Sequence, residues 1–124
     1  IKFDLIENLP HSLAIVRKSK SDIFIDQIGD RGGWGYGMNS VESLSMGICT
    51  MTEINDSYNS FIPDHPFIAV NKDNLENKIR DLIKERDIIN KYGSYGRSWV
   101  QKYHDIKQVS DALYDYYESI GVKF

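Results

Sequence analysis

Short apolar runs, separated by polar turns, occupy the first 70 residues of the chain. Four of these runs are predicted to be strands, at residues 1–6, 22–28, 48–53 and 67–70. Helices are predicted between them, at residues 10–19 and at residues 38–46. Residues 55–66 are predicted to form a loop. Strands that alternate with helices indicate a mostly parallel sheet with helices on both faces, so we expect a Rossmann-like, three-layer α/β domain.

From residue 74 the apolar positions repeat with the period of an α-helix. Asp73 and Glu76 have the spacing of a capping box at the start of this run. Gly93 and Gly96 are expected to interrupt the run. The residues of the run that are predicted to face the core lie before these glycines, namely Leu75, Ile79, Leu82 and Ile83.

A last helix is predicted at the end of the chain. Asp105 and Gln108 have the spacing of a second capping box, and Gly121 is expected to end the helix. The apolar side of this helix is predicted to comprise Ile106, Val109, Leu113, Tyr116 and Ile120. We therefore expect a helical C-terminus.

The size of the chain, 124 residues and 14.3 kDa, fits one domain. Fifteen Lys and Arg against 18 Asp and Glu give a formal net charge of -3, so no nucleic-acid partner is expected. No apolar run approaches the roughly 20 residues of a membrane span, and a cytoplasmic location is expected. Cys49 is the only cysteine, which excludes an internal disulfide. His11, His65 and His104 lack metal-ligand spacing, so no metal is expected.

The main candidate for chemistry is a glycine-rich loop at residues 29–37 (GDRGGWGYG), which holds five of the nine glycines. It follows a predicted strand and precedes a predicted helix, the position at which parallel sheets bind ligands. Glycines let the backbone approach a ligand, and the first N–H groups of the helix favour a phosphate. The pattern is neither Gly-x-Gly-x-x-Gly nor a P-loop, so a connector without a ligand is a second interpretation.

Glu42 lies about one turn into the helix that this loop opens. A carboxylate there accepts two hydrogen bonds, which suits the paired hydroxyls of a ribose. Glu42 is also explained as a first-turn acid that the helix dipole stabilises by about 0.3–1 kcal/mol. Spacing alone favours this second explanation. In either case we expect replacement of Glu42 to change the stability of the fold little.

The stretch GWGYGMNSVESLSMGICTMT, at residues 33–52, resembles the donor-site signature of GT-B glycosyltransferases of the retaining group-1, family-four kind. Members typically read Glu-Gly-Phe-Gly, four variable residues, then Glu-Ala-Met-Ala-x-Gly-x-Pro-Val. Glu42 matches the second glutamate, and Gly47 matches the glycine before the next strand. The glycine–aromatic–glycine element is matched by Gly35, Tyr36 and Gly37.

Residues 18–28 and 92–121 are similar to the family's neighbouring strand and closing helices, so the resemblance covers nearly the whole chain. Trp34 stands where the family usually has its first glutamate, which contacts the transferred sugar. Cys49 stands where proline is usual. The resemblance implies that residues 1–124 are the C-terminal part of a donor-binding domain, which is half of a two-domain GT-B fold.

The resemblance also implies a function, namely nucleotide-sugar-dependent transfer of a hexosyl group to an acceptor. The nucleotide-diphosphate sugar is then the donor substrate, and no cofactor is implied. Glu42 would hold the ribose hydroxyls, and no residue is assigned a catalytic role. The other implied contacts to the nucleotide sugar are Trp34, Gly35, Tyr36, Gly37, Met38 and Asn39. The implied partner is the N-terminal domain of the same protein, without which this chain is expected to be inactive.

Two other functions are compatible with the sequence. Sugar-nucleotide 2-epimerases share the two-domain architecture, although the order of strand, glycine loop and Glu42 is more like the transferases. The second alternative is a non-catalytic Rossmann or flavodoxin-like binding module, or a degenerate glycosyltransferase domain. Trp34 in place of glutamate is the main support for this last interpretation.

Overall fold

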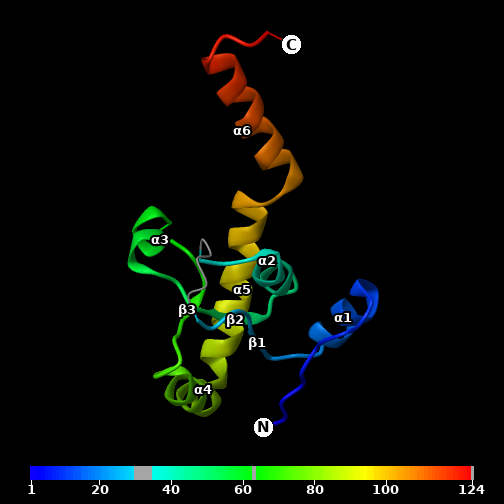
Figure 1. The fold of residues 1–124 in the computed structure, drawn as a ribbon, viewed down its shortest axis with the longest axis vertical. Helices are drawn as coiled ribbons and strands as arrows, with labels where there is room; N and C mark the ends of the chain where they lie inside the picture. Colours follow the sequence, from blue (N-terminus) through cyan, green and yellow to red (C-terminus); the bar gives the residue numbers. More distant parts are fainter. Residues whose placement is uncertain (30–34, 63, 124) are drawn as a thin grey trace.

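A computed structural model describes residues 1–29, 35–62 and 64–123. The described strands are β1 (Ile23–Ile25), β2 (Cys49–Thr52) and β3 (Ile68–Ala69). The described helices are α1 (His11–Lys18), α2 (Met38–Ser45), α3 (Asp56–Phe61), α4 (Leu75–Lys84), α5 (Arg86–Tyr103) and α6 (Ile106–Ser119). Their order confirms that strands alternate with helices up to residue 70 and that helices follow (Figure 1).

The three strands form one parallel sheet in the order β1-β2-β3. In the register, Ile23 pairs with Cys49, and Met51 pairs with Ile68 on its other side. Backbone bonding continues one residue past β1, because the N–H of Asp26 donates to the carbonyl of Met51 at 2.9 Å. The parallel sheet confirms the predicted α/β class.

Residues 1–6, predicted to be a strand, belong to none of the helices or strands of the described chain. Ile1 and Phe3 are exposed, and Asp4 forms an ion pair with Arg17 of α1. An apolar segment becomes a strand only where a neighbour offers backbone hydrogen bonds, and β1 pairs with β2 alone among the described strands. The described sheet therefore has three strands where about four were predicted.

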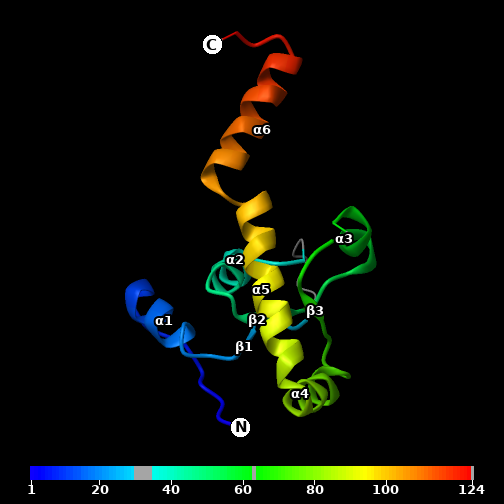
Figure 2. The same cartoon turned by 180° about the vertical axis from the view of Figure 1, so that it is seen from behind.

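Helices cover both faces of the sheet. Side chains alternate along β2, and its fully buried Cys49 and Met51 pack in a cluster with Leu82 of α4. Thr50 points to the opposite face, where its hydroxyl lies 2.8 Å from that of Ser43 in α2. α2 therefore covers one face, whereas α4 and the first half of α5 cover the other (Figures 1 and 2).

α5 runs without a break through Gly93 and Gly96, so the interruption predicted there is wrong. The helical run is broken earlier, at Glu85, between α4 and α5. A Cβ on Gly93 would lie 2.1 Å from the carbonyl oxygen of Gly47, and one on Gly96 would lie 2.4 Å from Cδ2 of Leu44. The two glycines thus allow α5 to pack closely against α2 and the turn that follows it, which outweighs their poor helix propensity.

Two helix starts differ from the prediction. Asn74, not Asp73, is the N-cap residue of α4, and Glu76 pairs with Arg80 instead of closing a capping box. The segment predicted to be a loop contains α3, which begins after the cap residue Asn55. Asparagine is a recognised N-cap residue, so the start of this helix could have been predicted from the sequence.

α6 begins at the predicted cap, because the carboxylate of Asp105 accepts a hydrogen bond from the backbone N–H of Lys107. The chain leaves the helix at Gly121, whose φ is +85°. α6 extends away from the rest of the domain (Figures 1 and 2). The residues of its predicted apolar side are all exposed, namely Ile106, Val109, Leu113, Tyr116 and Ile120.

Candidate functional site

The carboxyl ends of the three parallel strands lie at one edge of the sheet. The backbone N–H of Gly29 donates to the carboxylate of Glu53, which follows β2, at 2.6 Å. The side-chain amide of Gln27, which follows β1, donates to the carbonyl of Gly35 at 2.9 Å. These two bonds attach both ends of the glycine loop to this edge.

Gly35 and Gly37 form the end of the loop that leads into α2. Gly35 is buried with a φ of +106°, and a Cβ there would lie 2.6 Å from the ring of Tyr58. A side chain at this position would be strained in its backbone and would collide with that ring. Gly37 is the N-cap residue of α2. Trp34 lies outside the described residues.

The ring of Tyr36 packs in an aromatic cluster. Its centroid lies 4.7 Å from that of Phe67 and 5.6 Å from that of Trp99. Its hydroxyl lies 3.0 Å from Nε2 of His104, which follows α5. Burial raises the pKa of Tyr36 and lowers the pKa of His104, which favours the neutral form of both. The side chain of Tyr36 therefore fixes the loop to the core.

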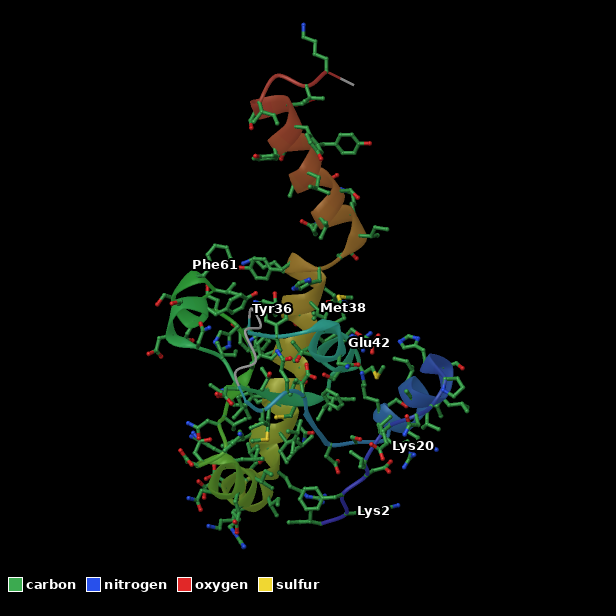
Figure 3. All side chains as sticks on the ribbon, in the orientation of Figure 1. Lys2, Lys20, Tyr36, Met38, Glu42 and Phe61 are labelled. Atoms are coloured by element: carbon green, nitrogen blue, oxygen red, sulfur yellow. The ribbon has the colours of Figure 1, made fainter. Side chains whose placement is uncertain are left out.

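The first turn of α2 combines backbone donors with a nearby carboxylate. Met38 and Asn39 are its first two residues, where N–H groups have no intrahelical acceptor, and the side chain of Met38 is exposed (Figure 3). Asp26, which follows β1, accepts a hydrogen bond from the hydroxyl of Ser40 at 2.5 Å. Its Oδ2 lies 3.7 Å from where a Cβ of Gly37 would stand. A phosphate bound here would share the positive end of the helix dipole with Asp26.

The carboxylate of Glu42 is held by two side chains of α1. Nε2 of His11 lies 2.8 Å from Oε1, and Nζ of Lys18 donates to Oε2, also at 2.8 Å. Lys18 donates further to Oδ1 of Asn39 at 3.1 Å, and its Nζ lies 4.7 Å from the centre of the Phe24 ring. The side chain of Lys18 is 4% exposed, whereas that of Glu42 is 26% exposed.

These contacts keep Glu42 ionised. The hydrogen bond from Lys18 lowers the pKa of Glu42 more than its partial burial raises it, and the bond from His11 lowers that pKa further. The ammonium of Lys18 is buried, so its loss of a charged partner would be strongly destabilising. We therefore revise the expectation that replacement of Glu42 changes the stability of the fold little.

Apart from Trp34, the residues that the resemblance implies lie in one region but face different ways, as Tyr36, Met38 and Glu42 do in Figure 3. Asn39 and Glu42, three positions apart on α2, both contact Lys18 of α1. Tyr36 packs in the core, and Met38 is exposed. The described side chains therefore do not converge on a single point, and among the described residues a ligand at the start of α2 would meet mainly backbone and Glu42.

Sequence reasoning missed Lys18 and gave His11 no part in the site. A signal was present, because the two residues are the first and last of an eight-residue helix and lie two turns apart on one face. Their common partner could not be identified from the sequence. Lys18 and Glu42 are 24 positions apart, and only the tertiary fold brings them together.

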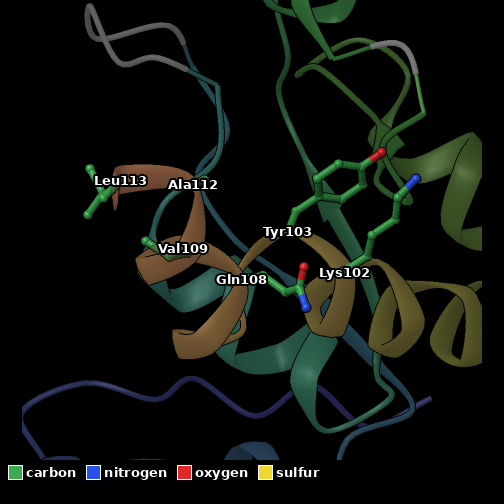
Figure 4. A pocket seen from close by; sticks show the side chains of 6 residues that line it. All are labelled: Lys102, Tyr103, Gln108, Val109, Ala112 and Leu113. Carbon is green, nitrogen blue, oxygen red and sulfur yellow. The ribbon is translucent and has the colours of Figure 1, made fainter. Parts of the chain in front are cut away.

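No protein-family model, curated protein or solved structure matches the chain. Within the described ranges, no helix has the length and apolar character to cross a membrane, and no group of three or more His, Cys, Asp or Glu side chains could hold a metal. A pocket of about 410 Å³ lies at the junction of α5 and α6, and the described residues that line it include none of the predicted site (Figure 4).

Proposed function

We propose that the chain is the donor-binding part of a nucleotide-sugar-dependent glycosyltransferase, which transfers a hexosyl group to an acceptor. The observation that carries the proposal is the position of an ionised carboxylate, Glu42, in the helix that begins at a glycine loop. The two described ends of the loop lie at the carboxyl edge of a parallel sheet, where open α/β sheets bind nucleotides. The resemblance of residues 33–52 to a donor-site signature supports the same function.

The proposed ligand is a nucleoside diphosphate joined to a sugar. Its ribose hydroxyls donate to Glu42, and its diphosphate lies at the N–H groups of Met38 and Asn39. When the glycosidic bond breaks, the leaving diphosphate gains negative charge, which the positive end of α2 stabilises. Transfer also requires an oriented acceptor, which the N-terminal domain of such enzymes binds, so we infer that this chain alone binds the donor without transferring it.

A binding module without transferase activity is the second candidate. His11 and Lys18 already contact both oxygens of Glu42, and Asp26 lies at the end of α2 where the diphosphate would bind. A carboxylate beside a diphosphate opposes its binding by charge repulsion. Under this alternative, Glu42 serves to attach α1 to α2.

Calorimetric titration of the chain with UDP, GDP and ADP tests the proposal, in the wild type and in Glu42→Gln. A hydrogen bond to a charged group contributes roughly 1.5–3 kcal/mol, so we expect the variant to bind at least about tenfold more weakly. Glu118→Gln, which neutralises an exposed acid of α6, is the matched control. Melting curves establish that each variant is folded. No binding of any of the three nucleotides to the wild type, or equal affinity in a folded Glu42→Gln, would favour the second candidate.

A further inference from the structure

The two side chains that hold Glu42 come from opposite ends of α1. His11 is the first residue of the helix and Lys18 is the last, and each contacts a different oxygen of the carboxylate. Rotation of the carboxylate about its last side-chain bond would break at least one of these contacts. The plane of the carboxylate is therefore fixed relative to α1 and α2.

The same arrangement leaves part of the carboxylate available. An ionised carboxylate offers about four acceptor positions, two on each oxygen. His11 and Lys18 use one position on each oxygen, and the Glu42 side chain is 26% exposed. About two acceptors remain, one on each oxygen, which is the number that a pair of neighbouring hydroxyls requires.

The burial and hydrogen bonds of Lys18 suit it to hold the Glu42 carboxylate in place. It is buried, whereas Leu13 and Val16 of the same helix are about half exposed. Its ammonium bonds to Asn39 as well as to Glu42, so two residues on one face of α2 share a single cation. The side chain thus joins α1 to α2 through polar contacts that hold the Glu42 carboxylate at a fixed distance from the start of α2.

We propose that Lys18 and His11 are positioning residues, which hold the Glu42 carboxylate so that its remaining acceptors bind the 2′ and 3′ hydroxyls of a ribonucleoside diphosphate. This inference rests on the proposed function. Neither residue contacts the nucleotide, and both act through Glu42. Lys18 has the larger effect, because its contact is buried, whereas the side chain of His11 is 75% exposed.

The test compares affinity for UDP, GDP or ADP with affinity for the matching 2′-deoxynucleotide. The wild type is expected to bind the ribonucleotide about tenfold more tightly than the deoxynucleotide. In Lys18→Met this ratio falls to about two or less, because the ribonucleotide loses the contacts of both hydroxyls, whereas the deoxynucleotide loses only the contact of its 3′ hydroxyl. His11→Gln gives an intermediate ratio. Lys20→Met, which removes the same charge from an exposed neighbouring position, leaves the ratio unchanged (Figure 3).

The ratio separates a positioning role from a merely structural one. An equal loss of affinity for both nucleotides in Lys18→Met would show general damage to the site and would overturn the positioning role. An unchanged ratio in folded Lys18→Met and His11→Gln would also overturn it, while leaving the proposed function intact. Failure of the wild type to bind any nucleotide would overturn the proposed function and this inference together. If Lys18→Met unfolds, the exposed His11 supplies the deciding variant.

Discussion

Replacement of Gly93 by alanine tests whether α5 must pack closely against the turn between α2 and β2. In an unpacked helix this change would be favourable by about 0.5–1 kcal/mol, because glycine is a poor helix former. In this fold the new Cβ would lie 2.1 Å from the carbonyl oxygen of Gly47 and 3.7 Å from the backbone nitrogen of Cys49. The obstacle is backbone, so no side-chain rotation relieves it.

The expected loss of stability follows from how far the new Cβ and the carbonyl oxygen of Gly47 must separate. Unstrained heavy-atom contacts lie at about 3.5 Å, so α5 has to move away from the turn by about 1.4 Å. Overpacking of this kind costs about 1–3 kcal/mol. The movement also loosens the contacts of Trp99 and Val100, which belong to the core cluster on the same helix. We expect a net destabilisation of about 2 kcal/mol, which lowers Tm by about 8 °C in a domain of this size.

Urea unfolding, followed by tryptophan fluorescence, to which the buried Trp99 contributes, measures this loss. Ser94→Ala, at the exposed neighbouring position of α5, is the matched control and is expected to change stability by no more than about 0.5 kcal/mol. A Gly93→Ala protein as stable as the wild type, beside a Ser94→Ala control that behaves as expected, would refute the close packing of α5 on this turn.

Two further predictions concern ionisable side chains. Burial raises the pKa of the Cys49 thiol to about 12, so a thiol reagent at pH 8 should modify Cys49 only as the protein unfolds; rapid labelling of the native chain would contradict its burial. Burial lowers the pKa of His65 and of His104, so their contribution to stability is complete above the unfolded value of about 6.5 and is lost as the pH falls. The urea midpoint should therefore be lower at pH 5.5 than at pH 7.5, with a smaller decrease in His104→Gln, and a midpoint independent of pH would argue against this linkage.

The elements that could be predicted from the sequence are those fixed by local patterns. α2 was predicted as a short helix at residues 38–46 that Gly47 closes, and Gly47 has the positive φ, +76°, that is typical of such an end. β2 was predicted as a strand at residues 48–53, and all four residues of the observed strand are buried. The predicted interruption at Gly93 was wrong because glycine occurs both where a helix breaks and where a continuous helix packs closely against a neighbour. The low helix propensity of glycine predicts a break, whereas the close contact with Gly47 explains why a glycine stands inside a continuous helix.

In the candidate site, too, features set by local sequence could be predicted and features set by tertiary contacts could not. The position of Glu42 after the glycine loop is a local fact and could be read from the sequence. The partners of its carboxylate could not, because Lys18 is a long polar residue at the end of an amphipathic helix, where solvent exposure is the usual expectation. Its burial beside Glu42 gives that carboxylate a structural task in addition to the proposed ligand.

This double task decides which measurement is informative. Replacement of Glu42 removes the charged partner of a buried ammonium as well as any contact to a ribose, so a loss of affinity in that variant has two physical causes. Comparison of a ribonucleotide with its deoxynucleotide separates them, since both ligands meet the same packing and differ by one hydroxyl. A structural disturbance weakens both ligands equally and leaves the ratio of their affinities unchanged, whereas loss of the Glu42 contacts weakens the ribonucleotide more, because it has one more hydroxyl bound to the carboxylate. The discrimination between two ligands, measured in one protein, is therefore a stricter test of Glu42 than the affinity of either.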